Sequence, residues 1–144
     1  MSVIAKLVEA LESKLVACAP NATVVKRRAV EMRPGDPLPL IIIGLPPSGE
    51  GLEEIAFSRG LLWSYPIKVG IYMASNRAID LDLSWLNFRE SVRDQVYQRI
   101  AWEGGQAADF EMSTTPPFGQ ADTEGTMSAT VFDVIYKVEG QGLG

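Results

Sequence analysis

The strongest constraint on the fold is an alternating run of residues, 61–74. One set of its side chains is almost wholly apolar and consists of Trp63, Tyr65, Ile67, Val69, Ile71 and Met73. The other set is Ser64, Pro66, Lys68, Gly70 and Tyr72. Because successive side chains of a strand point to opposite faces of a sheet, this pattern predicts one long strand with one buried face. Pro66 has no amide hydrogen to donate, so we expect a sheet edge or a bulge close to it.

Three further segments have the character of strands. Residues 130–139 alternate in the same way and should pair within the same sheet; their apolar set is Phe132, Val134, Tyr136 and Val138. Residues 23–30 are rich in β-branched side chains, which favour strands. Residues 38–45 are apolar on both faces, so this strand should be covered on both sides. We expect helices on one side of it and a neighbouring subunit on the other.

Two segments have helical periodicity. Residues 3–17 place apolar side chains at helical spacing, and Ser2 is a suitable N-cap. A second helix is predicted from about residue 85 to residue 102, with Ser84 as N-cap and an apolar stripe made of Phe88, Val92, Val96 and Ile100. Its expected outer face is Arg89, Glu90, Arg93, Asp94 and Gln98. The order of elements predicts an α+β fold in which two helices pack on one face of a four- to five-stranded, mostly antiparallel sheet.

The length of 144 residues fits a single domain. Residues 103–128 form a connection rich in Gly, Thr, Asp and Pro, which is longer than usual for a compact domain and is expected to be a long flexible loop. Ala108, Phe110 and Met112 alternate with polar neighbours, which indicates that a short strand lies within it. Residues 140–144 should form a loose tail.

The composition excludes several classes of function. The chain has no histidine and a single cysteine, Cys18, so it lacks Ser-His-Asp and Cys-His nucleophile systems, histidine-ligated metals and thiolate zinc clusters. The formal net charge of −5 does not suit a protein that binds nucleic acid through its phosphates. The apolar run at residues 38–45 is too short to span a membrane. We therefore expect no catalytic residues, no cofactor, no membrane partner and no sequence-specific nucleic-acid partner.

Three local patterns could carry chemistry, and each has a simpler interpretation. The glycine-rich segment 44–51 lacks the Lys and the Ser or Thr of a phosphate-binding loop, so we interpret it as a plain connecting loop. Asp80 and Asp82 could place two carboxylates on one strand face for Mg²⁺, but acidic residues also favour the start of the second helix. The triplet 26–28 is basic, but alternation places Lys26 and Arg28 on one face and Arg27 on the other, so a solvated edge strand is favoured over an anion site.

The helix at 3–17, the strands at 40–44, 63–69 and 131–138, and the helix at 88–100 together resemble the tail-terminator and minor tail proteins of long-tailed bacteriophages. The resemblance implies an α+β subunit that closes a ring, commonly a hexamer, at the head-proximal end of the tail tube and meets head-completion proteins. It implies a place in the virion tail, or in the host cytoplasm during assembly, for a phage or prophage-derived protein. A tail terminator and a head-tail joining protein both remain open.

If the chain is such a subunit, residues 45–56 and 103–128 are candidates for contacts between subunits or with the tube. A ring subunit needs exposed apolar surface and no reactive group. The candidate interface residues are Ile41, Ile43, Trp63, Tyr72, Phe110 and Phe118. The alternative is a stand-alone α+β module that binds a small ligand or a partner protein between its sheet and helices.

Overall fold

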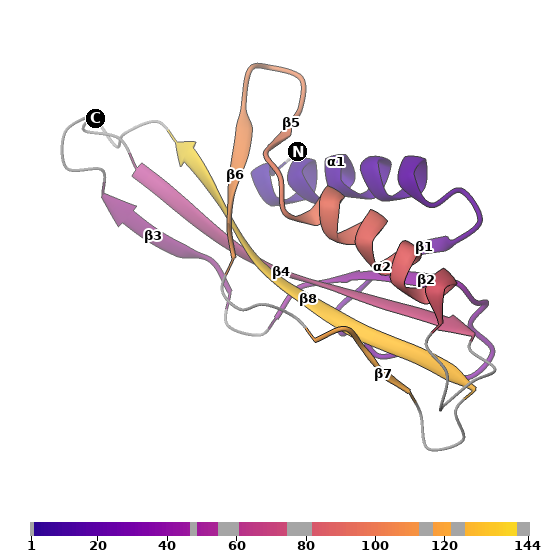
Figure 1. The fold of residues 1–144 in the computed structure, drawn as a ribbon. Helices are drawn as coiled ribbons and strands as arrows, with labels where there is room; N and C mark the ends of the chain where they lie inside the picture. The colour runs from indigo at the N-terminus through magenta and orange to yellow at the C-terminus, as the bar shows by residue number, and fades with distance from the viewer. Residues whose placement is uncertain are drawn as a thin grey trace.

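The computed structural model (Figure 1) describes residues 2–46, 49–54, 61–74, 82–112, 117–121 and 126–140. Two helices lie on one side of a curled sheet, and two long strands run side by side through its centre (Figure 1). The elements are α1 (Val3–Cys18), β1 (Thr23–Arg27), β2 (Leu40–Gly44), β3 (Gly51–Glu54), β4 (Leu61–Ala74), α2 (Leu83–Val96), β5 (Ile100–Ala101), β6 (Ala107–Met112), β7 (Gln120–Ala121) and β8 (Met127–Gly140).

Strands β4 and β8 form the centre of the sheet. Each has 14 residues, and they pair antiparallel over their full length, from Leu61 opposite Gly140 to Ala74 opposite Met127. The long strand predicted at residues 61–74 is confirmed. Pro66 lies where β4 pairs with β8 alone, because β3 ends its pairing at Ser64 and β2 begins its pairing at Lys68. On the side of β4 away from β8, Pro66 therefore lies between the ends of two partner strands, β3 and β2, which gives the local sheet edge that we expected.

The sheet has more strands than the sequence indicated. Its order is β1-β2-β4-β8-β6-β5, with β3 also paired to β4 and β7 also paired to β8, which makes eight strands in the part of the chain that the structure describes. All pairs are antiparallel except β1 with β2. The predicted number of four to five strands is therefore too low, whereas the prediction of a mostly antiparallel sheet is confirmed, with one parallel pair that makes the sheet mixed. The missed strands β3, β5 and β7 have four, two and two residues, too few to show a period.

The connection at residues 103–128 is not one continuous loop. It contains β6, which continues the sheet from β8, and the two-residue β7. The alternation of Ala108, Phe110 and Met112 indicated this strand correctly. Residues 113–116, 122–125 and 141–144 lie outside the described part of the chain, and so does most of the expected C-terminal tail.

Helix α1 closes one face of the sheet. Ser2 caps it by accepting a hydrogen bond from the Ala5 amide at 3.2 Å. Leu7, Leu11 and Leu15, spaced four residues apart, are fully buried. They pack in one core with α2 and with the alternating apolar residues of β4 and β8, as the sequence predicted.

Helix α2 differs from the expectation at both ends. Its N-cap is Asp82, whose carboxylate accepts a hydrogen bond from the Trp85 amide at 3.2 Å, and not Ser84. It ends at Val96, because the Val96 carbonyl accepts a hydrogen bond from the buried Tyr136 hydroxyl at 2.5 Å and Ile100 begins strand β5. The helix is thus attached at its C-terminal end to the central strand β8.

The parallel pairing of β1 and β2 requires the chain to cross over the sheet, and residues 28–39 make this crossover. Val30 lies against the sheet face opposite the helices. A Cβ added to Gly70 would lie 3.0 Å from the Val30 Cβ, and one added to Gly44 would lie 2.8 Å from the Val30 Cγ1. The Tyr72 hydroxyl donates a hydrogen bond to the Val30 carbonyl. The second cover of β2 is therefore the chain's own crossover, and not the neighbouring subunit that we expected.

An ion pair holds this crossover to the edge strand. Arg27 donates two hydrogen bonds to the Asp36 carboxylate, at 2.6 and 2.7 Å, and the Arg33 amide donates a third at 2.7 Å. The bidentate guanidinium contact is the main reason that the pKa of Asp36 lies well below its usual range, and the Arg33 amide lowers this pKa further.

We predict that Gly44→Ala destabilises the fold through Val30. The added methyl group would overlap the Val30 side chain at 2.8 Å, which we expect to cost about 1–3 kcal/mol. In the background of Val30→Ala the same change should cost less, with a coupling of about 0.5–2 kcal/mol. Urea unfolding of the two single variants and the double variant measures this coupling. Additive losses would contradict the crossover packing.

We predict a pH-dependent contribution from Asp36. Since its pKa is depressed in the folded state, the unfolded chain binds the proton more readily, and the pair stabilises the fold above the ordinary aspartate pKa of about 3.9. Asp36→Asn should lower the melting temperature at pH 7, and its difference from the wild type should shrink as the pH falls below about 4. The control is Asp94→Asn, at a side chain that is 58% exposed. A difference that persists unchanged at pH 2.5 would contradict this origin.

Candidate assembly surfaces

The most exposed large apolar side chain of the described residues belongs to Phe118, which is 74% exposed. Its backbone is nevertheless held firmly. The Trp85 indole donates a hydrogen bond to the Phe118 carbonyl at 2.8 Å, and the Arg89 Nε and the Thr130 hydroxyl each donate one to the Pro117 carbonyl at 3.2 Å. The loop therefore displays an aromatic ring in water while its main chain is fixed to α2 and β8.

Gly119 allows this close approach. Its backbone φ is +132°, a conformation that residues other than glycine rarely adopt. A Cβ at this position would also lie 2.6 Å from the Trp85 ring. The loop can therefore lie directly on the indole that anchors it.

Arg89 lies beneath the Phe118 ring. Its guanidinium carbon is 5.0 Å from the centre of the Phe118 ring and 5.6 Å from that of Phe132, so the cation contacts one exposed and one buried aromatic ring. The residue is only 6% exposed, and this burial is the largest cause of the lowering of its pKa. The prediction that Arg89 belongs to the outer face of the second helix is therefore wrong.

The buried stripe of α2 explains this correction. It is Trp85, Arg89, Val92 and Val96, at spacings of four, three and four residues, whereas Phe88 is only half-buried. A charged residue is not expected in such a stripe, and one acceptor for Arg89, the Pro117 carbonyl, belongs to a loop distant in sequence. The sequence signal for the burial of Arg89 was its position four residues after Trp85, on the same face of the helix.

The segment that carries Phe118 is acidic. Residues 100–136 contain no Lys or Arg, and their acidic residues are Glu103, Asp109, Glu111, Asp122, Glu124 and Asp133. Among the described ones, the side chains of Asp109 and Glu111 on β6 are 80% and 55% exposed, and they form ion pairs with Arg99 at 3.6 Å and with Lys137 at 3.0 Å. With these two flanking cations included, residues 99–137 still contain six acidic and two basic residues, so the stretch of sequence that carries the exposed aromatic ring is acidic overall.

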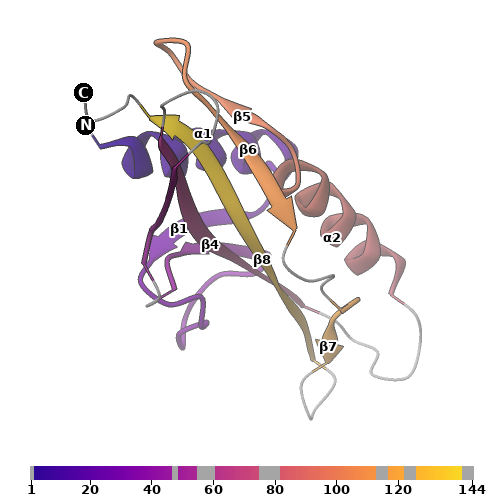
Figure 2. The same cartoon turned by 90° about the vertical axis from the view of Figure 1, so that its left-hand side faces the viewer.

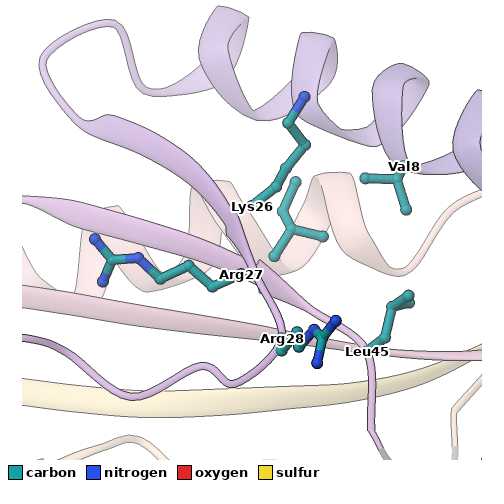
Figure 3. A pocket seen from close by; sticks show the side chains of 6 residues that line it. Val8, Lys26, Arg27, Arg28 and Leu45 are labelled. Carbon is teal, nitrogen blue, oxygen red and sulfur yellow. The ribbon is translucent and has the colours of Figure 1, made fainter.

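A pocket of about 510 Å³ opens at the opposite edge of the sheet, between β1 and α1 (Figure 3). Its lining residues are Val8, Lys26, Arg27, Arg28, Ile43 and Leu45. Lys26 extends towards α1, where its ammonium lies 3.3 Å from the Glu12 carboxylate, and Arg27 points away from the other labelled side chains (Figure 3). Arg28 is exposed, and no described residue forms an ion pair with it. The pocket thus joins apolar walls to a basic rim.

The pocket and the Phe118 loop lie at opposite edges of the sheet. Strand β1 is one end of the strand order, whereas β6 and β7 both pair on the far side of β8. Figure 2 shows this separation, with β1 on one side of the view and β6, β7 and α2 on the other. The chain therefore has two unlike surfaces on opposite flanks.

The six candidate interface residues fall into three groups. Ile41 and Ile43 are 0% and 2% exposed and pack in the core beneath the helices, so Ile41 offers no free area to a second chain and Ile43 offers only the small part that lines the pocket. Trp63 and Tyr72 are half-buried; the Trp63 ring lies against Gly140, and the Tyr72 hydroxyl holds the crossover. Phe110, at 41% exposure, and Phe118 remain available at the acidic edge. Whether any of the six forms an interface stays a prediction.

Two of the three patterns that could have carried chemistry, the glycine-rich segment 44–51 and the pair Asp80 and Asp82, do not assemble a site in the described residues. Asp82 caps α2, while Asp80 lies outside the described residues, as do parts of the connections at 44–51 and 45–56. The part of the chain that the structure describes contains no group of three acidic or cysteine side chains placed to hold a metal ion. No described helix is long and apolar enough to cross a membrane.

The sequence analysis missed the pocket because it is assembled from three separate segments. Val8 is on α1, Arg28 follows β1 and Leu45 follows β2. The basic triplet was recognised, but the apolar neighbours that make it one side of a pocket are adjacent only in the fold.

The fold is similar to that of a chain in the virion of a native gene transfer agent particle. The TM-score is 0.53 at 16% sequence identity, and the match covers 96% of this chain and 98% of that chain. No protein-family model matches the sequence, and no curated protein matches it either. At this identity the likeness establishes a shared fold.

We predict that Arg89→Ala is far more costly than Arg93→Ala. Removing Arg89 leaves the Pro117 carbonyl with one donor fewer and removes a buried cation from two rings, which should cost about 2–3 kcal/mol. Among the described residues, the Arg93 side chain pairs with its exposed neighbours Glu90 and Asp94, so its loss should cost less than about 1 kcal/mol. Urea unfolding of both variants tests the inward position of Arg89, and equal losses would contradict it.

Proposed function

We propose that this chain is a structural subunit of a virion, in the tail or in the head-tail joining complex, where its copies close a ring. The observation that carries the proposal is the shared fold with a virion chain, which extends over almost the whole length of both chains. The order of elements resembles phage tail-terminator and minor tail proteins, which supports the same role. We propose a structural role rather than a catalytic one.

The distribution of surfaces supports assembly of this kind. A ring is built from heterologous contacts, in which one patch of a subunit meets a different patch of the next. The exposed Phe118 at one edge of the sheet and the pocket beside β1 at the other are two such unlike patches on opposite flanks. A twofold dimer, by contrast, requires one self-complementary patch.

By analogy with the resembled family, the ring would be a hexamer that meets the tail tube and head-completion proteins. The protein would then lie in the virion tail, or in the host cytoplasm during assembly, whether the source is a phage or a prophage. The choice between a tail terminator and a head-tail joining protein depends on which neighbours the ring contacts.

We predict that the purified chain forms closed oligomers. Size-exclusion chromatography with light scattering should give a mass several times the 15.7 kDa of one chain, and negative-stain images should show rings. The ring should be favoured at high protein concentration. A mass of one chain at every concentration and salt condition would contradict the proposal.

The pocket favours a second candidate function, the binding of a small anionic ligand. Its volume of about 510 Å³ lies within the range of about 300–1,000 Å³ typical of ligand sites, and its rim is basic. An aromatic sulfonate such as 1-anilinonaphthalene-8-sulfonate is a suitable probe. A saturable thermal shift from this probe in a chain that stays monomeric would favour a binding module over a ring subunit.

A further inference from the structure

The Phe118 loop has the properties of a preformed anchor. A large aromatic side chain in water is unfavourable unless a partner covers it, and aromatic anchors dominate the energy of many protein interfaces. The three hydrogen bonds from Trp85, Arg89 and Thr130 fix the backbone at Pro117 and Phe118 before any partner arrives. Little backbone freedom is then lost when the ring is buried, which favours tight association.

The pocket beside β1 has the properties of a receptor for such an anchor. Val8, Ile43 and Leu45 provide apolar walls, and Leu45 is 47% exposed although it is a large aliphatic residue. The volume of about 510 Å³ leaves ample room for one aromatic side chain together with part of its loop.

The charges of the two edges favour a second copy of this chain as the partner. The rim of the pocket carries Lys26 and Arg28, and Arg28 has no ion-pair partner among the described residues. Residues 99–137, which include Phe118, contain six acidic residues and two basic ones, Arg99 and Lys137, which pair with Asp109 and Glu111. The chain as a whole has a net charge of −5, so two copies repel each other unless they meet with the basic edge of one against the acidic edge of the other.

We propose that Phe118 of one copy inserts into the pocket formed by Val8, Ile43 and Leu45 of the next copy, with Arg28 facing the acidic segment that carries Phe118. The inference rests on the proposed function, since it assigns the contact through which the ring closes. The occupant is a second copy of this chain. Each copy offers an anchor at one edge and a receptor at the other, so the contact repeats head to tail.

The test uses two variants that each break one half of the contact. Phe118→Ala removes the anchor, and Leu45→Asp places a carboxylate in the receptor, where it opposes both the apolar ring and the acidic segment. Both positions are exposed in one copy, so the fold should persist; circular dichroism and urea unfolding check this. In sedimentation velocity, each variant should associate about tenfold more weakly than the wild type, or more weakly still.

Mixing the two variants gives the decisive measurement. The Leu45→Asp chain keeps its Phe118, and the Phe118→Ala chain keeps its pocket, so one intact contact can form between them. An equimolar mixture should therefore contain dimers with one chain of each kind and no larger species. A contact made by one self-complementary patch, or a general loss of stability, would not produce this rescue.

Two further variants make the result specific. Leu83→Ala is the matched control, because Leu83 is 65% exposed on α2 but is not part of either surface, and it should assemble like the wild type. Arg28→Glu changes only an exposed side chain and should weaken association and reduce its dependence on salt.

The outcomes separate this inference from the proposed function. Rings that persist in Phe118→Ala and Leu45→Asp would overturn the contact and leave the ring proposal standing. Folded variants that stay monomeric when mixed would also overturn it. Loss of the 1-anilinonaphthalene-8-sulfonate thermal shift in Leu45→Asp, with assembly unchanged, would assign the pocket to a small ligand instead. A wild-type chain that is monomeric under all conditions would overturn both proposals.

Discussion

The full-length pairing of β4 and β8 is the interaction on which the rest of the structure depends. Two strands of 14 residues each, paired at every position, form a ribbon to which β2, β3, β6 and β7 attach. The strict alternation along both strands divides the ribbon into two faces, and only the face that carries residues such as Ile67 and Phe132 is covered by helices. A slip of one residue in this register would turn the whole apolar set towards solvent, so the pairing also determines where the helices and the two edges lie.

The elements predicted from the sequence are those whose signal is local and long. The period of two in β4 and the stripe of Leu7, Leu11 and Leu15 in α1 both extend over several turns or pleats, and both elements were placed correctly. The short strands β3, β5 and β7 were missed because two to four residues show no period and form only when a longer strand offers an edge. The parallel pairing of β1 and β2 was also missed, since it depends on a crossover that is held by tertiary contacts of Val30 and Asp36.

The prediction of the candidate interface residues was limited in the same way, because it also depends on tertiary contacts. Phe110 and Phe118 could be proposed from the sequence because an aromatic residue in a polar connection is conspicuous there. Ile41 and Ile43 were proposed because their strand is apolar on both faces. A strand whose two faces are covered by its own chain has the same sequence pattern as a strand with one face covered by a partner subunit, so the sequence could not distinguish the two cases. Arg89 was assigned to solvent because a charge in an apolar stripe is rare. Its burial depends on the Pro117 carbonyl and on two aromatic rings that lie 28 or more residues away.

The placement of Arg89 also links the core to the acidic edge. A buried guanidinium is tolerated only where acceptors and aromatic rings replace its hydration, and here the replacement includes the ring that remains in solvent. Covering Phe118 would remove water from this cation–ring contact and strengthen it, because the attraction grows as the local dielectric falls. The same burial would leave Arg89 wholly without water, so a partner that covers Phe118 with apolar groups is suitable only if the Pro117 carbonyl keeps its hydrogen bond. Any partner that covers Phe118 should therefore bury the ring and leave the loop backbone in place.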